Sequence, residues 1–304
     1  MTEAAAGPGA RALLERHGLR AKKSWGQNFL HDERVVERIV ASAALTPEDV
    51  VVEIGAGTGA LTRRLAARGC RVKAVERDPD LIPLLQAELG AHGNVEIVAA
   101  DALGFDFAAA AQAAGRPVVV LGNLPYQITS PLLFRIIAAA AAGAVVKRAV
   151  LMVQKEVAER IAARPGSKIY GRLSVMVQAV ADAAVLFHVG PGAFIPQPTV
   201  TSTVFALTPR ASRIAGVEGQ LFAAVVRAAF AGRRKMLRRS LEPAFGAATA
   251  SAALTAAAIA GTRRAEELTV EEFARLAAQL AALGATPPAV TAGEAGAAGD
   301  DDDA

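Results

Sequence analysis

The sequence predicts an α/β protein with a doubly wound, mostly parallel sheet, followed by a smaller, all-α C-terminal domain. Short β-branched or aliphatic runs recur in the first half of the chain, with segments of helical length between most of them. The runs lie at residues 50–54, 72–75, 95–98, 118–121 and 150–153. This alternation is typical of βαβ units, whose strands pair in parallel. Strand signals disappear after residue 210, which predicts the separate helical domain.

The later strands are not followed by crossover helices. A loop rich in Pro, Gly, Lys and Arg at 164–172 precedes three further strand-like runs, which we expect to complete the sheet, at least partly antiparallel. These runs are 175–180, 185–189 and 200–206. Helical segments follow at 220–230, 235–241 and 270–283, around an Ala-rich centre. Pro209 and a small polar cluster interrupt the pattern, so the domain boundary is expected near 208–213.

The composition indicates a folded, soluble protein. Of the 304 residues, 53% are hydrophobic and 20% are charged, which excludes a disordered chain for the bulk of the sequence. The longest uncharged stretch, 243–262, lacks the bulky apolar residues of a membrane span, and the N-terminus has no signal-peptide pattern. A cytoplasmic location is therefore expected. Residues 1–10 and the acidic tail at 285–304 are expected to be disordered.

Cysteine, histidine and charge counts narrow the possible chemistry. The single cysteine, Cys70, excludes an internal disulfide, and four scattered histidines offer no ligand spacing for zinc, so metal-free catalysis is expected. The net charge is +4, and omitting the five acids of the tail raises it to +9. Such a charge suits a polyanionic partner, although basic surfaces also serve solubility.

A glycine-rich turn follows the first predicted strand of the sheet. Residues 51–59 read Val-Val-Glu-Ile-Gly-Ala-Gly-Thr-Gly and lead into a predicted helix at 61–67. Glycines such as Gly55 and Gly57 let a ligand approach the backbone closely. The spacing G-x-G-x-G differs from the dinucleotide pattern G-x-G-x-x-G, which favours S-adenosylmethionine over a nicotinamide cofactor.

Two acids follow the next strands at their carboxyl ends. Glu76, 19 residues after Gly57, can accept hydrogen bonds from both hydroxyls of a ribose. Asp101 follows the third strand, where it can accept a hydrogen bond from an adenine amino group. Ligands of open α/β sheets bind at this edge, so both acids are assigned to the cofactor site.

The fourth strand delivers the sequence Asn123-Leu124-Pro125-Tyr126. An adenine N6 is a poor nucleophile because its lone pair is delocalised into the ring. The Asn123 side-chain oxygen and the Leu124 carbonyl could accept its two hydrogens and favour a pyramidal nitrogen. Pro125 would stiffen the turn and Tyr126 would stack on the base. No strong base is needed before transfer, so positioning and electrostatics would carry the reaction.

These motifs resemble those of the bacterial small-subunit ribosomal RNA adenine dimethyltransferases, over roughly residues 13–283. The resemblance implies a Rossmann-like class I S-adenosylmethionine-dependent methyltransferase fold and dimethylation of N6 of two adjacent adenosines near the 3′ end of the RNA. It also implies that Asn28 and Leu30 contact the cofactor, beside Gly55, Glu76 and Asp101, and that Asn123 lies at the reacting centre. The motifs that carry the resemblance are residues 22–32, 55–59, 123–126, 154–156, 171–175, 194–198 and 230–235.

A basic cluster marks the helical part of the chain. No acid lies between Glu218 and Glu242, and Arg234 with Arg238, like Lys235 with Arg239, would share a helix face. Such a cluster suits phosphates. The residues expected to bind RNA are Lys22, Lys23, Lys168, Arg172, Arg227, Arg233, Arg234, Lys235, Arg238 and Arg239. The expected domains are thus a cofactor-binding catalytic domain at 11–208 and an RNA-binding domain at 209–284.

Several alternatives remain open on the sequence alone. Phe194 is expected either to form the second face of an aromatic clamp around a flipped adenine or to pack in the core, and the sequence favours neither role over the other. The same chemistry on large-subunit RNA, as in macrolide-resistance methyltransferases, is the nearest rival function. A non-catalytic RNA-binding assembly factor or transcription factor is another, and a nicotinamide-dependent oxidoreductase is more distant. The expected partner is small-subunit RNA in the 30S subunit or its precursor, with the protein acting as a monomer.

Overall fold

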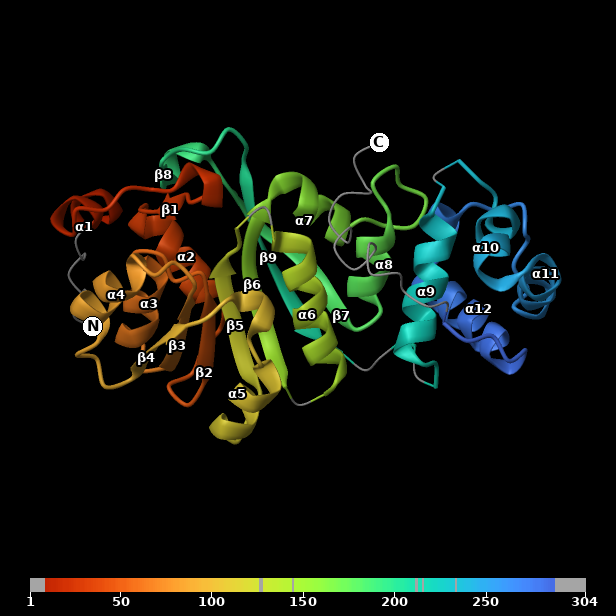
Figure 1. The fold of residues 1–304 in the computed structure, drawn as a ribbon, viewed down its shortest axis with the longest axis horizontal. Helices are drawn as coiled ribbons and strands as arrows, with labels where there is room; N and C mark the ends of the chain where they lie inside the picture. Colours follow the sequence, from red (N-terminus) through yellow and green to blue (C-terminus); the bar gives the residue numbers. More distant parts are fainter. Residues whose placement is uncertain are drawn as a thin grey trace. The chain divides into compact units, whose positions relative to one another are not determined.

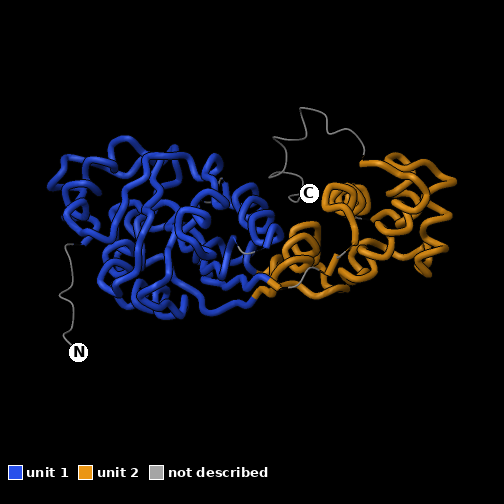
Figure 2. The backbone as a smooth tube through the Cα atoms, turned by 90° about the horizontal axis from the view of Figure 1, so that it is seen from below, with its two compact units in different colours: residues 1–158, 184–209 blue, residues 159–183, 210–304 orange. Residues whose placement is uncertain are grey.

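The computed structural model describes residues 9–125, 128–143, 145–210, 213–214, 216–232 and 234–287. The chain forms two compact units, coloured separately in Figure 2. The first unit takes residues 1–158 and 184–209, and the second takes residues 159–183 and 210–304. Each unit is described by itself.

A seven-stranded sheet forms the centre of the first unit, in the order β4-β3-β2-β5-β6-β9-β7 (Figure 1). Neighbouring strands from β4 to β6 pair in parallel, whereas β9 pairs antiparallel with β6. The strands are β2 (Val50–Ile54), β3 (Arg71–Glu76), β4 (Val95–Ala99), β5 (Val118–Asn123), β6 (Val146–Gln154), β7 (Ala181–Val189) and β9 (Ser202–Pro209). The predicted α/β class with a mostly parallel sheet is confirmed.

The central strands β2 and β5 are buried along nearly their whole length. All five residues of β2 are buried, including Glu53, which is the pattern of a strand covered on both sides. Helix α2 packs on α3, and α5 packs on α6. The helices of this unit are α1 (Ala10–Arg16), α2 (Glu33–Ser42), α3 (Ala60–Ala67), α4 (Leu81–Leu89), α5 (Phe107–Ala114), α6 (Thr129–Ala141) and, reaching past its end, α7 (Lys155–Ile161).

The order of the parallel strands reverses between β2 and β5. The chain passes from β2 to β3 and β4 on one side, then returns to β5 on the other side of β2. Ligands of such sheets bind beyond the carboxyl ends of the strands at this reversal. Residues that follow β2, β3 and β5 are therefore brought to one edge of the sheet.

The second unit is helical, as predicted. Helix α9 packs against α8, α10 and α12, and the rings of Phe230 and Phe273 lie 5.8 Å apart between their centres. The helices are α8 (Arg172–Gln178), α9 (Gly219–Phe230), α10 (Leu237–Phe245), α11 (Ala247–Ala256) and α12 (Val270–Ala282).

The strand predicted at 175–180 is wrong, because residues 175–178 belong to α8 and the next two residues form a turn. The β-branched run at Val175 and Val177 suggested a strand, but both side chains are buried on a helix that packs against α9. Ser174 Oγ accepts from the Gly171 N–H at 3.1 Å and donates to the Arg160 carbonyl. Tertiary packing thus overrides local propensity, and residues 159–183 group with the helical unit rather than with the expected domain 11–208.

Helix α10 begins at Leu237, two residues later than predicted. The N–H groups of Leu237 and Arg238 donate to the carbonyls of Arg263 at 2.8 Å and Gly261 at 3.1 Å. These loop carbonyls satisfy donors that the first turn of a helix leaves unpaired. Arg234 and Lys235 therefore precede the helix, and the helix face that they were expected to share with Arg238 and Arg239 does not form.

The chain ends lie mostly outside the described residues. The segment expected to be disordered at 1–10 is described only from Gly9, and α1 begins at Ala10. Of the expected acidic tail, only residues 285–287 are described. Among the described residues, no helix combines the length and the apolar character needed to span a membrane.

The N-terminal cap of α12 should contribute measurably to the free energy of unfolding. Thr269 Oγ1 accepts from the Glu272 N–H at 3.2 Å, and Glu272 Oε2 accepts from the Thr269 N–H at 2.9 Å. Thr269→Ala should lower the unfolding free energy by about 1 kcal/mol in urea denaturation. Thr255→Ala, on the exposed face of α11, is the matched control and should cost nothing, because Ala is the better helix former. Equal losses in both variants would contradict the capping role.

Candidate active site

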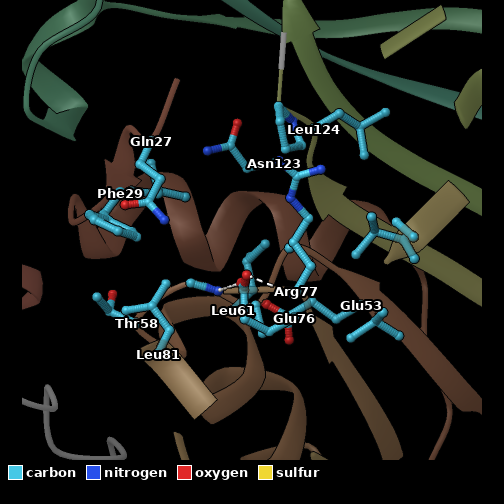
Figure 3. Close-up of a pocket in the computed structure, with 18 of the residues that line it drawn as sticks. Gln27, Phe29, Glu53, Thr58, Leu61, Glu76, Arg77, Leu81, Asn123 and Leu124 are labelled. Atoms are coloured by element: carbon cyan, nitrogen blue, oxygen red, sulfur yellow. Dashed lines mark hydrogen bonds between the residues drawn. The ribbon is translucent and has the colours of Figure 1, made fainter. Parts of the chain in front are cut away.

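A pocket lies at the carboxyl ends of β2, β3 and β5 (Figure 3). Three stretches of chain line it: residues 25–30, residues in and after β2, and residues 123–125. Glu76 and Arg77, at the end of β3, also line it, as do Val75, Leu81, Ala100, Ala102 and Ile128. The pocket therefore forms at the edge where the strand order reverses.

The glycine loop after β2 forms the floor of the pocket. Gly57 has a φ of +59°, and a Cβ there would lie 3.1 Å from the Phe29 ring. Only glycine fits this combination of left-handed backbone and close side-chain contact. The Gly57 N–H donates to Glu76 Oε2 at 2.9 Å, which joins the loop to the end of β3.

Backbone N–H groups hold the Glu76 carboxylate in place. Besides the bond from Gly57, its Oε1 accepts from the N–H groups of Arg77 and Asp78, each at 2.9 Å. A carboxylate can accept about four hydrogen bonds, so it retains acceptor capacity toward the pocket. Glu76 is a fixed acceptor at the sheet edge, as its predicted role requires.

Asn123 is the last residue of β5. Its Nδ2 donates to the Asn28 carbonyl at 3.1 Å, which places the amide oxygen on the other side of the group. Leu124 N–H donates to the Met152 carbonyl at 3.0 Å, and the Pro125 carbonyl accepts from Ile128 N–H and Thr129 Oγ1. The turn that carries the predicted acceptors is thus fixed by bonds on both sides.

The N-terminal segment forms the opposite wall, where Figure 3 shows Gln27 and Phe29. Strand β1 (Phe29–Leu30) pairs antiparallel with β8 (Phe194–Ile195). Leu30 is buried in the core and lines the pocket, and Asn28 also lines it. Asn28 and Leu30 are therefore brought to the same pocket as Glu76 and Asn123.

The family model described as ribosomal RNA adenine dimethylase matches residues 18–282. The chain belongs to this family. It is therefore an enzyme that uses S-adenosylmethionine to methylate adenine in ribosomal RNA.

Individual relatives agree with the family match. The chain is 47% identical to the ribosomal RNA small subunit methyltransferase A of Anaeromyxobacter sp. (strain K), over 88% of this chain and 96% of the relative. A crystal structure of a Plasmodium falciparum dimethyladenosine transferase matches with a TM-score of 0.70 and 25% identity, over 84% and 98% of the two chains. The 23S rRNA methyltransferase ErmE matches with a TM-score of 0.60 and 30% identity, over 84% and 100%.

The pocket residues of this dimethylase fit S-adenosylmethionine. The glycine cradle would admit an extended ligand close to the backbone, and Glu76 supplies carboxylate acceptors for hydroxyl groups. The residues that would hold the cofactor are Asn28, Leu30, Gly55, Gly57, Glu76 and Asn123, which all line this pocket.

Asp101 lies beside the pocket and not in its lining. It borders a neighbouring hollow, together with Trp25 and Arg77, which also line the main pocket. Asp101 Oδ1 accepts from the Leu103 N–H at 2.9 Å, and its Oδ2 lies 3.5 Å from an Arg77 nitrogen. A ligand that extends past Arg77 would reach this carboxylate.

Of the two aromatic residues expected to hold adenine, the structure describes only Phe194. Tyr126 lies outside the described residues. Phe194 is 1% exposed and packs in the core with Leu30, Val36 and Val204. A ring without an exposed face cannot stack on a base, so this burial favours the packing role that the sequence left open.

Lys22 was expected to bind RNA, but the structure gives its ammonium group other partners. Its Nζ lies 2.6 Å from Asp78 Oδ1 and 2.7 Å from Asp80 Oδ2, and these carboxylates raise the pKa of Lys22. Two carboxylates already neutralise this charge, so we leave Lys22 out of the RNA surface. Lys23 is exposed on the short helix at Lys23–Trp25.

The other expected RNA-binding residues lie in the helical unit, apart from Arg233, which is outside the described residues. Lys168 and Arg172 lie in and after the loop that precedes α8, and Arg227 is on α9. The exposed cations near the start of α10 are Arg234, Lys235, Arg238 and Arg239.

The sequence reading missed Glu53, a buried acid in the pocket lining. It is 1% exposed and accepts a hydrogen bond from Thr62 Oγ1 at 2.6 Å. Burial, with a smaller contribution from the nearby Glu76, raises the pKa of Glu53 to about 8. The available signal was an acid inside the apolar run 50–54.

Glu53 predicts a pH dependence of stability. The folded protein keeps this carboxyl protonated up to about pH 8, whereas the unfolded chain loses the proton near its ordinary value of 4.5. Between these values unfolding releases a proton, so stability should fall as pH rises. Glu53→Gln should flatten the profile of unfolding free energy from pH 5 to 8, measured without cofactor. The exposed control Glu15→Gln should keep the wild-type slope, and equal slopes in all three proteins would refute the effect.

Proposed function

We propose that this dimethylase transfers two methyl groups to N6 of each of two adjacent adenosines near the 3′ end of small-subunit (16S) ribosomal RNA. The proposed substrate is the 30S subunit or its precursor in the cytoplasm, and the protein acts as a monomer. The small-subunit target is supported by the relatives at 43–47% identity, which are named small subunit methyltransferases. The observation that carries the chemistry is the Asn123 amide in the same pocket as the glycine loop.

The proposed mechanism rests on positioning. S-adenosylmethionine supplies an electrophilic methyl group when it is bound. Asn123 Oδ1 and the Leu124 carbonyl accept the two N6 hydrogens, which directs the nitrogen lone pair out of the plane of the base. Leu124 is tied to β6 through Met152, and Pro125 to α6 through Thr129, so the acceptors are preorganised. Tyr126 is proposed to stack on the base.

The RNA surface proposed for the helical unit consists of Lys168, Arg172, Arg227, Arg233, Arg234, Lys235, Arg238 and Arg239. Its charge is supported by the absence of acids between Glu218 and Glu242. Arg239 makes a 3.8 Å ion pair with Glu242, and both side chains are exposed, so this pair competes weakly with phosphate. Lys23, in the first unit, is proposed as a further contact.

The target is tested by methyl incorporation from labelled S-adenosylmethionine into unmethylated small subunits, with large-subunit RNA as the comparison. The proposal expects N6,N6-dimethyladenosine in small-subunit RNA alone. Labelling of large-subunit RNA instead would assign the activity of the ErmE-like relatives. Cofactor binding without labelling of either RNA would support a non-catalytic assembly role.

Asn123→Ala tests the catalytic assignment. Loss of a preorganised acceptor should lower the rate of methyl transfer by about 100-fold or more. The loss of cofactor affinity should be much smaller, because the other five residues of the cofactor site remain in place. Single-turnover transfer and calorimetric binding of S-adenosylhomocysteine measure the two effects. Asn94→Ala is the control, since Asn94 bonds the carbonyls of Ala66 and Cys70 at the other end of the strands. Transfer at the wild-type rate in Asn123→Ala would sink the assignment.

Arg234→Glu with Arg238→Glu tests the RNA surface. If both residues contact phosphates, the slope of log binding constant against log salt should become less steep by roughly 2. Filter binding or fluorescence anisotropy with small-subunit RNA measures the slope. Arg68→Glu with Arg71→Glu makes the same change in net charge at the amino end of β3 and should keep the wild-type slope. An unchanged slope in Arg234→Glu with Arg238→Glu would remove these two residues from the RNA surface.

A further inference from the structure

A buried acid outside the predicted site ties one wall of the pocket in place. Asp78 lies two residues after Glu76 and is 1% exposed. Its Oδ1 accepts from Lys22 Nζ at 2.6 Å, and its Oδ2 accepts from Gln27 Nε2 at 2.6 Å. Both partners belong to the N-terminal segment that forms the wall. One carboxylate therefore holds this segment at two points.

The segment between the two tethers is closed on itself. Lys22 N–H donates to Gln27 Oε1 at 2.8 Å, and Trp25 N–H donates to the Lys22 carbonyl at 3.1 Å. Gly26 makes the turn with a φ of +62°. Residues 22–27 thus form a compact loop, and Asp78 fixes the loop as one body.

The residue after this loop orients the Asn123 amide. The Asn28 carbonyl accepts from Asn123 Nδ2 at 3.1 Å. An amide has its donors and its acceptor on opposite sides, so the position of the Asn28 carbonyl decides which way Asn123 Oδ1 faces. A displaced loop would move this carbonyl and would also change the pocket wall at residues 25–30.

We propose that Asp78 is a positioning residue: through Gln27 and Lys22 it fixes the loop at 22–28, which shapes the cofactor pocket and orients the Asn123 amide. The role in orienting Asn123 rests on the proposed function. The role in shaping the pocket concerns cofactor binding alone. The two roles have separate measurements.

Asp49 is a matched control that separates the positioning role of Asp78 from a general effect on stability. Asp49 is also buried, at 3% exposed, and its Oδ1 accepts from Lys147 Nζ at 2.7 Å. In both acids burial opposes ionisation, but the lysine hydrogen bond and other donors lower the pKa of the carboxyl. Asp78→Asn and Asp49→Asn therefore each remove the charge of a buried carboxylate that pairs with a lysine, and only Asp78 contacts the pocket wall. Lys22 keeps Asp80 Oδ2 as a second partner at 2.7 Å.

The fluorescence of Trp25 can report on the conformation of this pocket wall. Trp25 is the sole tryptophan, and it lines the pocket with Lys22 Nζ 4.9 Å and Arg77 Cζ 4.5 Å from its ring centre. Its emission depends on these neighbouring charges and on exposure. A change in the loop is thus visible without any measurement of activity.

The experiment titrates S-adenosylhomocysteine into wild type, Asp78→Asn, Asp49→Asn and Gln27→Ala, following Trp25 emission and calorimetry. Loss of a charge-assisted bond in the wall should raise the Kd about 10-fold in Asp78→Asn and shift Trp25 emission of the free protein. Gln27→Ala leaves the Lys22–Asp78 ion pair intact and should change the Kd and the Trp25 emission in the same direction. This variant keeps the proposal testable if Asp78→Asn folds poorly. Asp49→Asn should change thermal stability only.

Methyl transfer at saturating cofactor provides the second arm. The rate should fall about 10-fold in Asp78→Asn through the misoriented Asn123 amide and stay unchanged in Asp49→Asn. Affinity, emission and rate in Asp78→Asn that all match those of Asp49→Asn would overturn the proposal. If the wild-type protein methylates neither RNA, the proposed function fails. Changes in Trp25 emission and in S-adenosylhomocysteine affinity that occur in Asp78→Asn and Gln27→Ala, but not in Asp49→Asn, would still support the role of Asp78 in fixing the pocket wall.

Discussion

Parallel pairing of β2 with both β3 and β5 is the constraint on which the site depends. In these registers Ile54 is opposite Val75 on one side and Gly122 on the other. The residues that follow, the glycine loop, Glu76 and Asn123, must then emerge at one edge. A Cβ at Gly122 would lie 2.5 Å from the Ile54 carbonyl, so this glycine is needed for the close approach of β5 to β2. The backbone hydrogen bonds between these strands therefore determine which residues meet at the site.

The sheet edge supplies only part of the pocket, and the N-terminal segment supplies the rest. Strand β1 is anchored through β8, far along the chain, and the preceding loop is anchored through Asp78. Asn28 lies between these two attachments along the chain and lines the pocket. The segment thus lines the cofactor pocket and, through the Asn28 carbonyl, accepts a hydrogen bond from the Asn123 amide.

The parts of the site predicted from sequence are those that depend on local pattern. The glycine spacing, the acid at the end of β3 and the residues after β5 are each legible within a few positions, because strand ends and turns have short-range signatures. The roles of Lys22, Asp78 and Phe194 depend on partners more than 50 residues away, which no local pattern contains. The run 175–180 misled for the same reason, since packing against α9 selected a helix for a β-branched sequence.

Glu53 and Asp78 show how partners decide the charge of a buried acid. Both are 1% exposed, yet the pKa of Glu53 is raised and the pKa of Asp78 is lowered. Glu53 has a neutral hydroxyl donor and the nearby Glu76, whereas Asp78 has an ammonium group and an amide. Asp78 is thus ionised at neutral pH and can hold the wall by charge. Glu53 has no cationic partner in the described part of the chain, so burial keeps it largely protonated at neutral pH and it forms no such ion pair.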